Sequence, residues 1–155
     1  MATDLAVTQP EQRVDGAAMA ADGYRKLMGL ELHVQSALPR PLLELVKLRA
    51  SILNGCSFCV DMHSGDALKA GEESRRLFSV AAWHEAPWFS DTERAALALT
   101  DALTRMDDGV SDELWAAVVK QLGEADAVEL VLAIGTINVW NRLNAAFRTP
   151  PPALT

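Results

Sequence analysis

Both cysteines of the chain lie in one ten-residue stretch, NGCSFCVDMH, together with one of its three histidines. Two residues separate Cys56 from Cys59, and three more separate Cys59 from His63. On a helix that begins at Cys56, these spacings place the three side chains along one stripe. Unpaired N–H groups at a helix start favour a thiolate, and an imidazole can accept a thiol proton. The pattern therefore predicts reactive, redox-active thiols.

The spacing of the two cysteines also bears on the disulfide they can form. On a regular helix, Cβ atoms three positions apart are about 5–6 Å apart, whereas a disulfide needs about 3.5–4.5 Å. The first turn must tighten to close the bond, so we expect an easily reduced disulfide. Such a pair suits a cycle in which one thiolate attacks an oxidant, becomes a sulfenic acid and condenses with the other thiol.

A carboxylate joins this set if the helices on either side of Asn54 and Gly55 fold back as a hairpin. Glu44, which interrupts the apolar run PLLELV, then lies within about one turn of His63. An acid that faces the inside of a hairpin needs a partner. We therefore expect a chain from Glu44 through His63 to Cys59, in which the carboxylate orients the imidazole and makes it a better base.

Other interpretations of the same residues stay open. The two cysteines could be inert core residues, since unpaired cysteine is often buried. Cys56, Cys59, His63 and Glu44 could together bind zinc, although structural zinc sites usually draw ligands from two separate segments. Glu44 alone could be a solvated acid in the first turn of its helix, where the dipole favours it.

The elements that carry these residues are predicted to be almost all helical. The first helix is expected to have its apolar residues roughly on one side: Met19, Tyr24, Leu27, Met28 and Leu32. Ser90 with Glu93 has the pattern of a capping box. We expect one helical domain over residues 16–149, with flexible tails at 1–15 and 150–155. The helical stretches are expected within residues 16–38, 39–55, 56–70, 72–86, 90–106, 111–123 and 124–148.

Composition limits the partners. The net charge of −7 argues against nucleic acid and against an anionic membrane surface. Two cysteines are too few for a secreted disulfide framework and no signal peptide is apparent, so a cytoplasmic location is expected. The last helix is apolar on almost every side, but Glu129, Asn138, Asn141 and Arg142 interrupt it, which disfavours a membrane span. Its burial against a second copy predicts a homo-oligomer.

The spacing of Glu44, Cys56, Cys59 and His63 resembles the signature of the AhpD-like alkylhydroperoxidases, within the carboxymuconolactone decarboxylase superfamily. The likeness runs from LRASILNGCSFCVDMHSGDALKAG through WFSDTERAALALTDALT to INVWNRLNAAFR. The resemblance implies an all-α, compact multi-helix bundle that assembles into oligomers, commonly trimers or hexamers, with the cysteine pair at the start of a core helix. It also implies a peroxidase that reduces hydroperoxides without a cofactor and is regenerated by a dithiol reductant or a reductase partner protein.

The resemblance also assigns roles. It implies that Cys59 attacks the peroxide, that the more exposed Cys56 resolves the product and meets the reductant, and that Glu44 and His63 relay the proton. Phe58 stands where the best-studied type has a histidine, which bears on proton relay and on the choice of reductant. The decarboxylase branch lacks the cysteine pair, so the pattern argues against that activity. A second function stays open: a redox-sensing or structural oligomer of the same fold, without fast peroxidase turnover.

Overall fold

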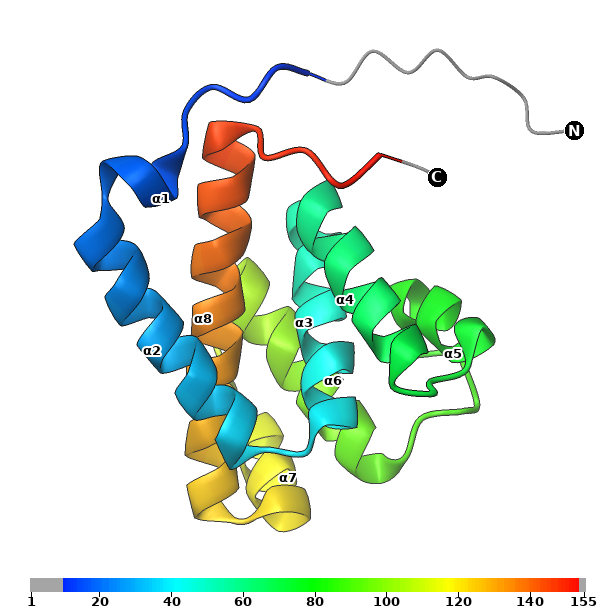
Figure 1. Cartoon of the computed structure of the whole chain (residues 1–155). Coiled ribbons are helices and arrows are strands. Elements are labelled where there is room, and N and C mark those ends of the chain that lie inside the picture. Colours follow the sequence, from blue (N-terminus) through cyan, green and yellow to red (C-terminus); the bar gives the residue numbers. More distant parts are fainter. Residues whose placement is uncertain (1–9, 154–155) are drawn as a thin grey trace, which may run out of the picture.

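The structure is a computed structural model that describes residues 10–153. This part of the chain contains eight α-helices and one short 3₁₀ helix, η1, and no strand (Figure 1). The predicted all-helical fold is therefore confirmed, whereas the ends of the two predicted tails, 1–9 and 154–155, lie outside the described residues. The elements are α1 (Gly16–Met19), α2 (Ala21–Ala37), α3 (Arg40–Asn54), α4 (Ser57–Lys69), α5 (Ser74–Ser79), η1 (Val80–Ala82), α6 (Asp91–Arg105), α7 (Asp112–Leu122) and α8 (Glu124–Phe147).

The turn between α3 and α4 follows from the local sequence. Gly55 takes a left-handed conformation, with φ of 65°, that a residue without Cβ adopts at little cost. Its N–H donates to the Ile52 carbonyl, and the N–H of Cys56 donates to the Ser51 carbonyl at 3.0 Å. These bonds close the end of α3 and leave Cys56 as the residue that caps α4.

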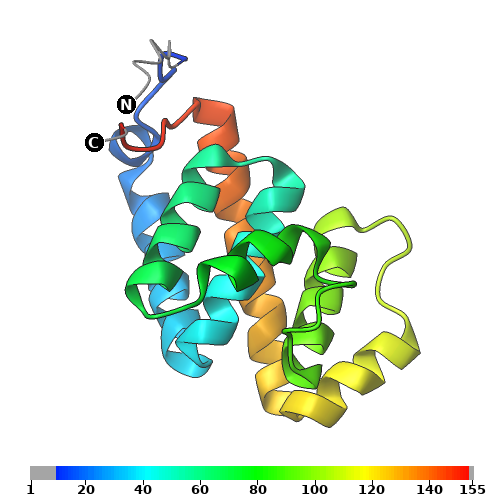
Figure 2. The same ribbon diagram turned by 90° about the vertical axis from the view of Figure 1, so that its right-hand side faces the viewer.

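Helix α3 lies at the centre because both of its faces are apolar. Leu42, Leu43 and Val46 join one core cluster with α2, α6, α7 and α8. Leu45 and Leu48 join a second cluster, beneath α4 and α5. The two views agree that α4 and α5 cover one side of α3 while α8 lies on the other (Figures 1 and 2). A helix held on both sides is a rigid support for the residues it presents.

The predicted capping box is confirmed at the start of α6. The Ser90 hydroxyl accepts the Glu93 N–H at 3.2 Å, and the Glu93 carboxylate accepts the Ser90 N–H at 2.8 Å. Both bonds satisfy amide groups that the first turn of a helix leaves unpaired. Local sequence therefore determines where α6 begins.

The helix expected over residues 16–38 differs in two ways from the prediction. The chain breaks at Ala20, whose backbone angles of φ −130° and ψ 49° are not helical. The expected apolar side also faces the core only in part. Tyr24 and Leu27 are half-buried, but Met19, Met28 and Leu32 are 76%, 46% and 60% exposed. The residues of α2 that are buried are Glu31 and Val34. The ion pair between Glu31 and Lys47 of α3 holds α2 in this orientation.

Helix α8 has apolar residues on two sides, and only one of these sides is buried in the core. Ala133, Ile134 and Ile137 lie in the core, whereas Val128, Leu132 and Val139 are 53%, 39% and 43% exposed. The spacing of these three exposed residues places them along one stripe. None of the helices described is long and apolar enough to cross a membrane.

The two described ends of the chain meet beside the end of α8. Arg13 donates its backbone N–H to the Phe147 carbonyl and its guanidinium to the Ala146 carbonyl, each at 2.9 Å. The segment after α8 then passes the start of α4 (Figure 1). Both ends therefore contribute to the surroundings of Cys56.

Candidate active site

The two thiols lie together at the start of α4. Cys56 and Cys59 are unpaired cysteines with exposed fractions of 3% and 0%. Their sulfur atoms are 2.7 Å apart and share a hydrogen bond. Cys56 has extended backbone angles, φ −85° and ψ 97°, so its side chain folds over the first turn. This cap geometry brings the sulfurs closer than regular helix spacing would.

The hydrogen bond between the two sulfurs moves their pKa values in opposite directions. The bond with the Cys59 thiol lowers the pKa of Cys56 to about 6 against the opposing effect of burial, and backbone N–H groups of Cys59 and Phe58 add to the lowering. The same bond, together with burial, raises the pKa of Cys59. Loss of a proton is therefore favoured at Cys56 and disfavoured at Cys59.

His63 and Glu44 meet across the α3–α4 hairpin, as the sequence predicted. His63 Nδ1 lies 2.9 Å from Glu44 Oε2, and both side chains are largely buried. Arg40 Nε lies 3.6 Å from the other carboxylate oxygen. Within residues 10–153, Glu44 is the only side chain hydrogen-bonded to His63, so no direct hydrogen bond joins His63 to Cys59.

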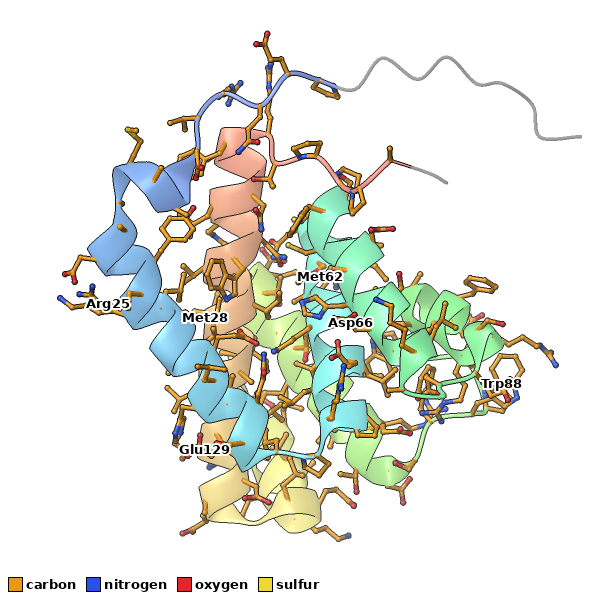
Figure 3. All side chains as sticks on the ribbon, viewed as in Figure 1. Arg25, Met28, Met62, Asp66, Trp88 and Glu129 are labelled. Atoms are coloured by element: carbon orange, nitrogen blue, oxygen red, sulfur yellow. The ribbon has the colours of Figure 1, made fainter. Side chains whose placement is uncertain are left out.

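A pocket of about 550 Å³ lies between α2, α3, α4 and α8, and both Cys59 and His63 line it. Met28 of α2 and Met62 and Asp66 of α4, which also line it, are labelled in Figure 3. The polar part of the wall has both signs of charge. The other lining residues are Glu31, Gln35, Arg40, Leu43, Glu44, Lys47, Phe58, Trp140 and Asn144.

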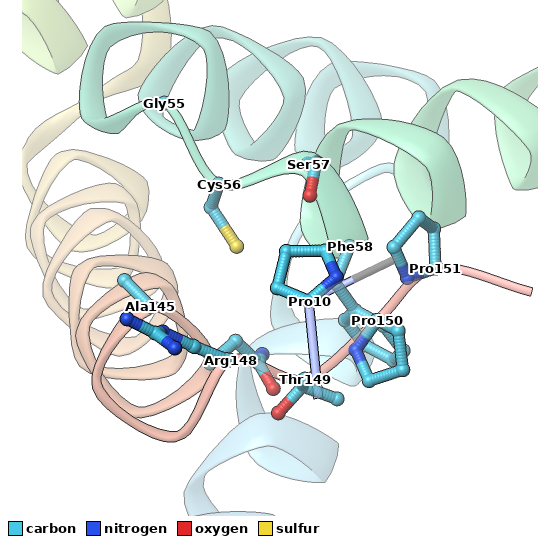
Figure 4. Close-up of a pocket in the computed structure, with 11 residues that line it drawn as sticks. Pro10, Gly55, Cys56, Ser57, Phe58, Ala145, Arg148, Thr149, Pro150 and Pro151 are labelled. Atoms are coloured by element: carbon cyan, nitrogen blue, oxygen red, sulfur yellow. The ribbon is translucent and has the colours of Figure 1, made fainter. Parts of the chain in front are cut away.

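A second pocket, of about 450 Å³, lies beside Cys56 at the start of α4 (Figure 4). Cys56 lines this pocket, whereas Cys59 lines the first one. Phe58 and Asn144 line both pockets and so form the partition between them. The remaining wall comes from the two chain ends and the start of α4: Pro10, Gly55, Ser57, Ala145, Arg148, Thr149, Pro150 and Pro151.

A buried ion pair beside the first pocket was not anticipated from the sequence. Lys47 of α3 donates to Glu31 of α2, and both residues are buried. Gln35 and Trp140 also donate to the Glu31 carboxylate, at 2.8 and 3.2 Å. Burial raises the pKa of Glu31, but the hydrogen bonds from Lys47 and Gln35 outweigh it and leave that pKa lowered. The pair fixes the inward face of α2.

Asparagines on α8 are a second group whose role at the site was missed. Asn144 donates to the Cys59 sulfur at 3.4 Å, and Asn141 donates to Ser51 at 3.0 Å. Asn138, Asn141 and Asn144 recur every three residues on an otherwise apolar helix. That recurrence is the signal in the sequence that could have pointed to them.

The other two histidines lie away from the thiols. His33 pairs with Glu129 at 2.8 Å and His84 stacks on Trp83, and neither lines either of the two pockets described above. The zinc interpretation needs three or more acidic, cysteine or histidine side chains to converge. No such group occurs in the part of the chain that the structure describes.

The chain is similar to known proteins in sequence and in structure. The sequence profile of the carboxymuconolactone decarboxylase family matches residues 19–102, more than half of the chain. The chain belongs to the carboxymuconolactone decarboxylase family. The predicted AhpD-like resemblance is confirmed by a solved structure from Agrobacterium tumefaciens, a protein of unknown function proposed to be the antioxidant defence protein AhpD. It is 34% identical, with a TM-score of 0.89 over 93% of this chain and 100% of that one.

Two further proteins are similar to this chain. The uncharacterized protein YdfG of Bacillus subtilis (strain 168) is 41% identical over 87% of this chain and 93% of its own length. The debrominase Bmp8 is 21% identical, with a TM-score of 0.79 over 88% of this chain and 74% of that one. At this identity the likeness to Bmp8 shows the shared fold alone.

Proposed function

We propose that this AhpD-like protein is a cysteine-based hydroperoxide reductase that is regenerated by a dithiol. The observation that carries the proposal is the arrangement of three groups. The sulfurs of Cys56 and Cys59 are 2.7 Å apart, Cys59 lines the same pocket as His63, and Glu44 holds the His63 ring at 2.9 Å. The likeness to a protein proposed to be AhpD also supports it.

The first step consumes the peroxide. The Cys59 proton moves along the sulfur–sulfur hydrogen bond to Cys56, which transfers the negative charge to Cys59. The Cys59 thiolate attacks the terminal oxygen of ROOH, the O–O bond breaks, and the leaving alkoxide takes a proton from protonated His63 to give ROH. Cys59 is now a sulfenic acid, and His63 regains its proton from solvent.

The second step closes the disulfide. The Cys56 sulfur attacks the Cys59 sulfur, the S–O bond breaks, and the hydroxide released takes the Cys56 proton to form water. One peroxide has then been reduced by two electrons and the two thiols oxidised by two. A dithiol reductant restores both thiols by thiol–disulfide exchange and leaves as its own disulfide.

The two pockets supply separate access for the two partners. Cys59 lines the pocket of about 550 Å³ with the proton relay, which suits the hydroperoxide. Cys56 lines the pocket of about 450 Å³ between the chain ends, which suits attack by the dithiol reductant or by a reductase partner protein. Oxidant and reductant then approach opposite sides of one disulfide.

The same proposal includes a homo-oligomer, a trimer or a hexamer. Val128, Leu132 and Val139 form an apolar stripe on α8 that residues 10–153 leave exposed. A second copy packed on that stripe would bury it.

Peroxide consumption with a panel of dithiol donors tests the function. We expect turnover in the native protein and none in Cys56→Ser or Cys59→Ser. Only Cys56→Ser should keep a thiol that peroxide converts to a sulfenic acid, which dimedone labelling and mass spectrometry detect.

Two outcomes would contradict the proposal. Sulfenic acid at Cys56 in Cys59→Ser would reverse the order of attack. Stoichiometric oxidation to a disulfide with no steady-state consumption under any donor would favour the redox-sensing alternative over an enzyme.

A further inference from the structure

The side-chain amide of Asn141 has only one orientation compatible with its partners. The Ser51 hydroxyl donates its single proton to the Lys47 carbonyl at 2.7 Å, so it must accept from the Asn141 N–H at 3.0 Å. On the other side, the Asn54 amide donates to the Asn141 carbonyl oxygen at 2.9 Å. Asn141 is 1% exposed, so no water competes for these bonds.

Asn144 lies one turn further along α8 and donates to the Cys59 sulfur at 3.4 Å, which lowers the pKa of that thiol. Asn141 also lowers the pKa of both Cys56 and Cys59. A side-chain amide from α8 therefore meets a sulfur that α4 supplies.

We propose that the side-chain amide of Asn144, packed beside the fixed amide of Asn141, forms an amide cradle that stabilises negative charge on Cys59, and that Asn144 is a catalytic residue because it touches the sulfur that attacks. The backbone N–H groups at the start of α4 lower the pKa of Cys56, whereas the Asn144 amide donates a hydrogen bond to the Cys59 sulfur. When the proton moves from Cys59 to Cys56, the charge passes to a sulfur for which a donor is already in place.

Pre-positioned donors matter here because both sulfurs are buried. Cys56 and Cys59 are 3% and 0% exposed, so fixed dipoles of the protein must supply most of the stabilisation of a charge on Cys59. A donor that needs no reorganisation during the reaction lowers the barrier to attack. Asn144 also borders both pockets, so it can contact the peroxide and the disulfide in turn.

Asn144→Leu tests the cradle, since leucine has nearly the same size and no donor. The test uses the reduced full-length Cys56→Ser protein, in which Cys59 is the only thiol, with and without Asn144→Leu. Thiolate absorbance at 240 nm and alkylation of Cys59, followed by mass spectrometry, give the titration. We expect thiolate formation at Cys59 to move up by about one pH unit in Asn144→Leu, as loss of a hydrogen bond to a charged group predicts. Asn138→Leu in the same background is the matched control, because Asn138 lies on the same helix and donates to Thr104 at 3.1 Å instead of to a sulfur.

An unchanged titration in Asn144→Leu would overturn the cradle, and so would an equal shift in Asn138→Leu. Circular dichroism and thermal unfolding check that both variants fold. Should Asn144→Leu fail to fold, Asn144→Ala is titrated against Asn138→Ala with the same expected difference. The titration needs no peroxide, so the cradle and the proposed function, on which its use in catalysis rests, fail by different measurements.

Discussion

His63 Nδ1 lies 2.9 Å from Glu44 Oε2, although 19 positions separate the two residues in the chain. The two side chains belong to different helices, and both are largely shielded from solvent. A buried carboxylate in this position fixes the orientation of the ring. The contact therefore holds His63 in place for the proton transfer that we propose.

Glu44→Gln should slow peroxide oxidation of Cys59 by about 100-fold, because the amide keeps the size but loses the charge that supports the imidazolium. Single-turnover oxidation followed by stopped flow measures this rate. Arg40→Gln is the control: Arg40 lies 3.6 Å from the same carboxylate with a side chain that is 63% exposed, so its loss should change the rate less than about threefold. Equal losses in both variants would contradict a proton-relay role.

Alkylation by iodoacetamide should occur first at Cys56, with half of its maximal rate near pH 6, because the Cys59 hydrogen bond lowers the pKa of Cys56 to about 6. The rate falls below that pH as the thiolate takes up a proton. Because the folded pKa is lower than the unfolded one, the reduced protein should also gain stability from pH 6 toward about 8.5. Peptide mapping and urea unfolding measure the two effects, and Cys56→Ser should show neither.

Lys47→Met should destabilise the protein by about 3–5 kcal/mol, because it leaves the buried Glu31 carboxylate without its cation. Urea unfolding measures the free energy. Adding Glu31→Gln should recover a large part of this loss, since no buried charge is then unpaired. Additive losses in the double variant would mean that the two residues do not interact.

Leu132→Glu should dissociate the proposed oligomer, because it puts a charge in the middle of the exposed apolar stripe on α8. Size-exclusion chromatography with light scattering gives the mass of the native protein, for which we expect three or six chains of 16.8 kDa. Met106→Gln, at a site 62% exposed beyond the end of α6, should leave the mass unchanged. A native protein that is monomeric at micromolar concentration would refute the oligomer.

Local signals predicted most of the fold. Gly55 ends α3, Ser90 and Glu93 start α6, and each acts through backbone groups within a few residues of itself. The face of α2 was misjudged because its orientation depends on Glu31 reaching Lys47 on another helix. A pattern of apolar residues carries no information about a long-range ion pair.

The sequence by itself predicted which side chains lie together at the proposed site. Cys56, Cys59 and His63 lie on one helix, and a short hairpin brings Glu44 to them, so helix geometry and one turn fix their relation. Only the tertiary structure decided which sulfur holds the charge and which donors face it. That outcome depends on the extended backbone of Cys56 and on α8, whose Asn144 reaches Cys59 from 85 positions away. Contacts between distant segments arise from the packing of all the helices together, and no local spacing encodes them.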